Sequence, residues 1–129
     1  MSTDSEPSTA TARPSAGCAL CWRAGFAVSV VVQLLVLYLP RVPAAPGPAG
    51  LDKVVHVLVF AAVAWTGLRT GIPAGPLIGL LLANAVVSEV YQGLFLPQRT
   101  GDPRDTAADV IGVLLGWFLA RRHRSGRSG

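Results

Sequence analysis

Charged residues are scarce in this sequence: they make up 14% of its 129 residues, against roughly 25% in an ordinary soluble domain. A small soluble chain exposes much of its surface and needs charge to cover it, so the scarcity argues against a soluble enzyme. The two cysteines are too few for a disulfide scaffold. The hydrophobic content of 51% argues against a disordered chain. The mean hydropathy of +0.49 indicates a chain whose solvent is lipid.

Four apolar stretches, each taken with its flanks, approach the roughly 20 residues that a membrane span needs. They cover residues 22–39, 51–68, 72–96 and 103–120. Prolines and glycines separate them, and Asp102 followed by Pro103 is typical of a helix start, with Asp as N-cap and Pro at the first helical position. The predicted fold class is therefore an all-α membrane protein, an antiparallel bundle of four transmembrane helices.

The chain is predicted to have three parts. Residues 1–20 are rich in Ser, Thr, Pro and Ala and form a disordered cytoplasmic arm. Residues 21–121 form the four-helix transmembrane domain. Residues 122–129 form a basic cytoplasmic tail, which is best explained as an anchor attracted to anionic lipid. We expect no nucleic-acid partner, because no binding fold accompanies this charge.

The basic residues predict the orientation, since cytoplasmic flanks of membrane spans carry the excess of Lys and Arg. Four spans put both termini on one side, which then holds seven basic residues against four on the other. Both termini are therefore predicted in the cytoplasm, and the protein is predicted to be a multi-pass protein of the plasma membrane. An alternative makes residues 1–44 a cleaved signal peptide, although the long N-terminal region and Pro43 in the cleavage site argue against it.

Polar residues recur inside the predicted spans, where a central carboxylate costs roughly 2.5–3.5 kcal/mol and needs a partner. His56, Glu89 and Asp109 lie on three different helices at a similar depth in the outer leaflet. Pairs spaced i,i+3 or i,i+4 share one helix face, as Asp52 and His56 do. We therefore predict a polar pocket that opens outward. Its predicted residues are Asp52, Lys53, His56, Glu89, Gln92, Arg99, Asp105 and Asp109.

The fourth predicted helix also carries a ridge of small residues with a period of four. This spacing lets two helices approach closely. The ridge consists of Ala108, Gly112, Gly116 and Ala120.

At these residues the sequence resembles the VanZ-like family of small bacterial integral membrane proteins. Three motifs carry the resemblance: Asp52-Lys53-x-x-His56, then Glu89-x-x-Gln92-x-x-Phe95-x-Pro97-x-Arg99, then Asp105-x-x-x-Asp109-x-x-Gly112-x-x-x-Gly116. The sequence departs from the family at Phe60, where Tyr is frequent, and at Asp109, where Asn is frequent. The resemblance implies a cell-envelope setting. It also suggests an association with glycopeptide (teicoplanin) resistance, but it supplies no mechanism.

Three functions are compatible with this sequence. In the first, the pocket binds an envelope lipid, a lipid-linked precursor or a glycopeptide-type drug. In the second, a membrane enzyme modifies such a lipid with His56 or Glu89 as general base, although the sequence assigns no catalytic residue. In the third, the ridge makes the protein an assembly subunit, and a homo-oligomer is left open. The polar residues could also hold the helices together without any chemistry.

No cofactor is predicted. A divalent metal held by the carboxylates and His56 is conceivable, but one His among scattered acids is a poor zinc signature. Cys18 and Cys21 form an isolated C-x-x-C motif, which we interpret as a spectator pair or a palmitoylation site.

Overall fold

The computed structural model describes residues 16–40, 47–97 and 101–126, and within these ranges the chain forms four helices and no strand. The helices are α1 (Ala16–Tyr38), α2 (Leu51–Arg69), α3 (Ala74–Phe95) and α4 (Pro103–Ser125). The prediction of an all-α fold with four helices is therefore confirmed. The start of α4 is also as predicted, because Asp102 is its N-cap and Pro103 is its first residue.

Two predicted boundaries differ from the structure. Helix α1 begins at Ala16, so residues 16–20, which were predicted to belong to the disordered arm, are helical. Ala, Cys and Leu in this stretch are compatible with a helix that continues upstream of the apolar run. Helix α4 continues to Ser125, into the predicted tail, where its arginines favour the negative C-terminal end of the helix dipole. The rest of the predicted arm and tail lies outside the described residues.

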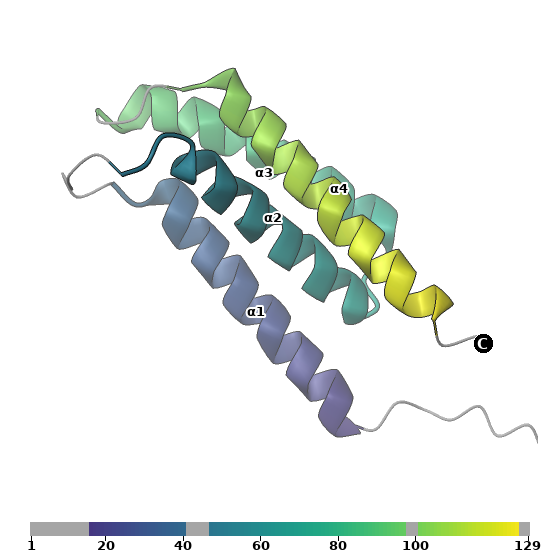
Figure 1. The fold of residues 1–129 in the computed structure, drawn as a ribbon. Coiled ribbons are helices and arrows are strands. Elements are labelled where there is room, and N and C mark those ends of the chain that lie inside the picture. Colours follow the sequence, from purple (N-terminus) through teal and green to yellow (C-terminus); the bar gives the residue numbers. More distant parts are fainter. Residues whose placement is uncertain (1–15, 41–46, 98–100, 127–129) are drawn as a thin grey trace, which may run out of the picture.

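Helix α2 holds a central place in the fold, because it contacts each of the other three helices and packs most extensively against α4 (Figure 1). The C-terminal ends of α1 and α3 lie at the same end of the fold as the N-terminal ends of α2 and α4. We call this the polar end, because the ion pairs between α2 and the start of α4 lie there. At the opposite end Arg124 donates to the Leu68 carbonyl over 3.1 Å.

The small-residue ridge of α4 lies against α2. A Cβ atom at Gly112 would come within 2.5 Å of the Val57 carbonyl oxygen, and one at Gly116 within 2.5 Å of the Ala61 carbonyl oxygen. Ala108 and Ala120 continue the same buried face. The two backbones can approach this closely only because Gly112 and Gly116 lack side chains. The ridge is therefore used inside the chain, and an assembly contact through it would require α2 to move away.

The distribution of polarity is the reverse of that in a soluble protein. Large apolar side chains point outward, with Leu80 and Leu94 exposed to 70% and 72%. Polar side chains are buried inside, among them His56 at 1% and Asp109 at 0% exposure. A contiguous apolar exterior of this kind requires a partner or lipid to cover it. Because α1, α2 and α3 are each long and apolar enough to cross a membrane, lipid fits this surface.

Helix α4 differs from the other three in its charge. Its 23 residues span about 34 Å, enough to cross a hydrocarbon core of about 30 Å. It carries acids near its start and arginines near its end, so its composition alone does not make it a membrane span. The acids Asp105 and Asp109 are buried against the rest of the protein rather than facing outward. The fourth span therefore stays a prediction.

We expect Gly112→Ala to lower the stability of the folded protein. The added methyl group meets backbone atoms of α2, and overpacking of this kind costs about 1–3 kcal/mol. Thermal unfolding of the detergent-purified protein measures this. Gly79→Ala is the matched control, because Gly79 lies in α3 and its added Cβ meets nothing within 4 Å. Equal loss of stability in both variants would contradict the proposed role of the α2–α4 contact.

Candidate functional site

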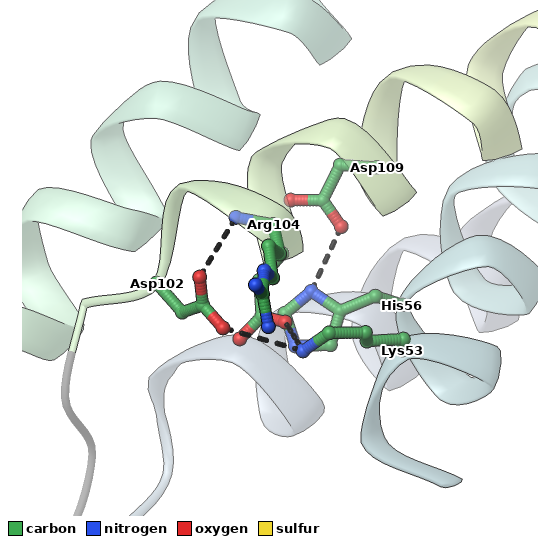
Figure 2. A network of polar contacts seen from close by, with 6 residues as sticks. Lys53, His56, Asp102, Arg104 and Asp109 are labelled. Atoms are coloured by element: carbon green, nitrogen blue, oxygen red, sulfur yellow. Dashed lines mark hydrogen bonds and ion pairs between the residues drawn. The ribbon is translucent and has the colours of Figure 1, made fainter. Parts of the chain in front are cut away.

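The candidate site lies at the polar end, where one face of α2 meets the first two turns of α4 (Figure 2). Lys53 and His56 lie one turn apart on α2 and face the carboxylates of Asp105 and Asp109, which are one turn apart on α4. Lys53 can pair with Asp105 while His56 pairs with Asp109, because the two residues on each helix are separated by about one helical turn. Asp102, immediately before α4, adds a third acid to this end of the site.

Lys53 joins the start of α4 to α2 through two carboxylates. Its Nζ atom lies 2.9 Å from Asp105 Oδ1 and 3.4 Å from Asp102 Oδ2. The Asp105 side chain is 8% exposed, whereas Lys53 and Asp102 remain 39% and 37% exposed. The Lys53–Asp105 contact is therefore half-shielded from water, and the Lys53–Asp102 contact is screened by solvent.

Asp102 also caps α4. Its Oδ1 atom accepts a hydrogen bond of 2.9 Å from the backbone N–H of Arg104, one of the donors that a helix start leaves unpaired. The Arg104 N–H, and to a smaller extent the Lys53 ammonium, hold the pKa of the Asp102 carboxyl below its ordinary value. The capping carboxylate is thus kept charged beside the positive end of the helix dipole.

His56 and Asp109 form the most deeply buried contact of the site. His56 Nδ1 lies 2.8 Å from Asp109 Oδ1, and the two side chains are 1% and 0% exposed. A carboxylate at this distance favours the tautomer in which Nδ1 carries the proton and donates it to Asp109. The His56 Nε2 atom then presents its lone pair to the other side of the ring.

Glu89 approaches the same groups from α3. Both carboxylate oxygens are buried, and the backbone of Asp102 is the polar group that interacts with them. The charges of His56, Asp105 and Asp109 act on this carboxylate, so Glu89 belongs to the same group of polar residues. Three helices therefore contribute to one polar cluster, which we define by seven residues. They are Asp52, Lys53, His56, Glu89, Asp102, Asp105 and Asp109.

Part of this cluster has the composition of a metal site. Asp52, His56 and Asp105 each offer one ligand atom, and the three atoms lie within 4.8 Å of one another. Carboxylate oxygen and imidazole nitrogen are common ligands of divalent metals in proteins. These are the residues of the site that could hold an ion.

An apolar groove of about 330 Å³ runs beside the cluster, between α2 and α4. Two cations, Lys53 and Arg104, line it together with aliphatic side chains. Arg104 is exposed and forms no ion pair with the described residues. The aliphatic lining consists of Val54, Val57, Leu58, Ala107, Ala108 and Ile111.

The structure distributes the eight predicted pocket residues unevenly. Six of them belong to the polar cluster, and Gln92 is buried and donates to the Leu37 carbonyl of α1 over 3.0 Å. Gln92 therefore joins α3 to α1, and Arg99 lies outside the described residues. From the sequence, Asp102 was predicted only as the N-cap of the fourth helix. Its spacing of three from Asp105 was the available signal that both acids could reach one cation.

No protein-family model, curated protein or solved structure matches the chain. The resemblance to the VanZ-like family therefore remains a prediction from the motifs of α2, α3 and α4.

We expect Asp102→Asn to remove part of the pH dependence of stability. The pKa of Asp102 is lowered in the folded chain, so its carboxylate stabilises the fold above the unfolded-state pKa of about 4. This stabilisation is lost as the pH falls through the folded-state value. The variant should lose less thermal stability than the wild type between pH 7 and pH 3, because Asn still caps the helix but has no charge.

Asp102→Ala is the companion variant, because it removes the cap together with the charge. At pH 7 it should melt at a lower temperature than Asp102→Asn. If both variants melt like the wild type across the pH range, Asp102 neither caps α4 nor pairs with Lys53 in solution.

Proposed function

We propose that the protein is a four-span integral membrane protein that binds an anionic envelope lipid or lipid-linked precursor in the groove between α2 and α4. The shared chemistry of these ligands is a hydrocarbon chain joined to a phosphate. The observation that carries the proposal is the groove itself, whose walls are aliphatic and whose lining includes Lys53 and Arg104. Such a lining complements the chain and the phosphate of one lipid at the same time.

Arg104 is the main phosphate ligand in this proposal. Its guanidinium is exposed and forms no ion pair with the described residues, so binding a phosphate would not require it to leave a partner. Arginine also matches phosphate geometry through two parallel hydrogen bonds. Lys53 is already shared by Asp102 and Asp105, so it adds a second, weaker attraction.

The exposed sides of the groove favour a ligand from the bilayer over one from water. Val54, Leu58 and Ile111 line the groove and are 52%, 59% and 57% exposed. A lipid chain could enter sideways between these residues without crossing a polar barrier. The resemblance to the VanZ-like family supports a cell-envelope setting, and with it the glycopeptide resistance association.

We propose that both termini lie in the cytoplasm, which puts the polar cluster in the outer leaflet. The basic count supports this orientation. At the end opposite the polar end, Arg69 lies 4.6 Å from the Trp22 ring centre and Arg121 lies 4.6 Å from that of Trp117. Tryptophan with arginine is typical of a membrane–water interface.

A second candidate function is a membrane enzyme, and the His56–Asp109 contact is the observation that favours it. A buried imidazole oriented by a carboxylate is a common general base. In that case His56 Nε2 would accept a proton from the substrate. Release of a chemically altered lipid by the purified protein would distinguish the enzyme from the binder.

Lipid binding can be measured by native mass spectrometry on detergent-purified protein, with phosphatidylglycerol and a polyprenyl phosphate as separate probes. The wild type should retain at least one of them better than phosphatidylcholine. Arg104→Gln should weaken lipid retention about tenfold. This factor corresponds to a loss of about 1.4 kcal/mol of binding free energy, which is typical of one charge-assisted hydrogen bond. Preference for one probe would identify the lipid class.

Two matched controls make this experiment specific. Arg121→Gln removes an exposed arginine at the opposite end, and equal losses in both arginine variants would show general attraction of anionic lipid. Ala107→Phe fills the groove and should weaken retention, whereas Ala83→Phe adds the same ring to an exposed site of α3 outside the groove. Unchanged retention in Ala107→Phe would contradict the groove as the binding site.

Orientation can be tested with single cysteines in a background that lacks the exposed Cys18 and Cys21. An impermeant thiol reagent applied to intact cells should modify a cysteine at position 47, between α1 and α2. It should not modify cysteines at positions 70 and 126, at the opposite end. Modification of position 126 from outside would reverse the topology and put the polar cluster in the inner leaflet.

A further inference from the structure

We infer that Asp52, His56 and Asp105 form a binding site for one divalent transition-metal ion at the polar end of the fold. Their ligand atoms lie within 4.8 Å of one another, so small movements of the side chains would allow one ion to contact all three. The three residues come from two helices, with Asp52 and His56 one turn apart on α2 and Asp105 at the start of α4. The site is thus fixed by the packing of two rigid elements rather than by a loop.

The contact between His56 and Asp109 prepares the imidazole for a metal. With Nδ1 as donor to Asp109 Oδ1 at 2.8 Å, the remaining nitrogen, Nε2, has a free lone pair. Metal-binding histidines commonly donate their other N–H to a carboxylate in this way, which fixes the tautomer and the ring orientation. Asp109 is therefore a positioning residue of the proposed site and does not bind the ion.

The charge of the described part of the cluster is compatible with a bound cation. It contains five acids and one lysine, Lys53, and a second cation, Arg104, lines the neighbouring groove. Glu89 contributes a carboxylate with two buried oxygens, on which the charges of His56, Asp105 and Asp109 act. Several carboxylates in a region of low dielectric repel one another strongly. A divalent ion would remove most of this repulsion.

The ligand types indicate the class of metal. One imidazole nitrogen with two carboxylate oxygens suits borderline ions such as Zn²⁺ and Mn²⁺ better than Ca²⁺, which prefers six to eight oxygens. Three protein ligands leave positions for water or for an oxygen atom of a bound ligand. Binding to Nε2 would also exclude this nitrogen as a general base.

Lys53 competes with the proposed ion, because its ammonium lies 2.9 Å from Asp105 Oδ1. The same ammonium also lies 3.4 Å from Asp102 Oδ2, so it has a second acceptor when a metal occupies Asp105. Replacing Lys53 with Met removes this competitor. A metal site therefore predicts tighter metal binding in Lys53→Met, whereas a purely structural ion-pair network predicts only lower stability.

The test is metal binding by the purified full-length chain after chelation, with Mn²⁺ followed by electron paramagnetic resonance and Zn²⁺ by equilibrium dialysis. The wild type should bind one ion per chain. His56→Asn and Asp105→Asn should abolish stoichiometric binding, and Asp109→Ala should weaken it about 10–100-fold. Lys53→Met should bind more tightly than the wild type.

His123→Asn is the matched control, because it removes the other histidine, which lies beside Trp65 at the opposite end of the fold. This variant should bind metal like the wild type. Asp52→Asn, at a half-buried position near the start of α2, replaces His56→Asn if the latter fails to fold. A wild type that binds no metal, or variants of all three ligands that bind normally, would overturn the inference. Lipid retention is measured without added metal, so the two proposals can fail separately.

Discussion

The close approach of α2 and α4 is the constraint on which the rest of the structure depends. Gly112 and Gly116 allow backbone to lie against backbone, since a Cβ at either position would come within 2.5 Å of a carbonyl oxygen of α2. Because α2 and α4 lie this close together, short side chains elsewhere in their interface can also contact each other. The 2.8 Å contact between His56 and Asp109 lies one turn before Gly112. The polar cluster is therefore a consequence of how tightly these two helices pack.

Pairing inside this interface explains why acids occur in an otherwise apolar chain. An isolated carboxylate in the hydrocarbon region is costly, and removing one partner of a buried pair leaves the other uncompensated. Asp105 and Asp109 each have a basic partner on α2, so most of this cost is offset within the protein. Glu89 forms no ion pair with a basic side chain among the described residues, although its carboxylate oxygens are buried.

Local signals predicted the elements of this fold, and the partners of its side chains were harder to predict. Apolar runs, the Asp102–Pro103 start and the four-residue period of small side chains each depend on neighbours in sequence, and they placed four helices. Spacing shows which residues share a helix face, but not which neighbouring helix that face meets. Gln92 shares a face with Glu89 in sequence, yet it bonds to α1 because α3 contacts α1 as well as α4. Partners depend on helix rotation, which only packing determines.

Lys53 lines the proposed lipid groove and also contacts Asp105 of the proposed metal site, and this double contact has a thermodynamic consequence. It lines the apolar groove and at the same time neutralises Asp105 over 2.9 Å. A metal ion at Asp105 would take over that neutralisation and leave the ammonium with Asp102 and the groove. Lys53 would then attract a lipid phosphate more strongly. Because coupling between two ligands is reciprocal, an anionic lipid in the groove would strengthen metal binding by the same factor. The flexible side chain of Lys53 is sufficient for this coupling. Its single ammonium group can interact either with the carboxylates of the cluster or with a phosphate in the groove.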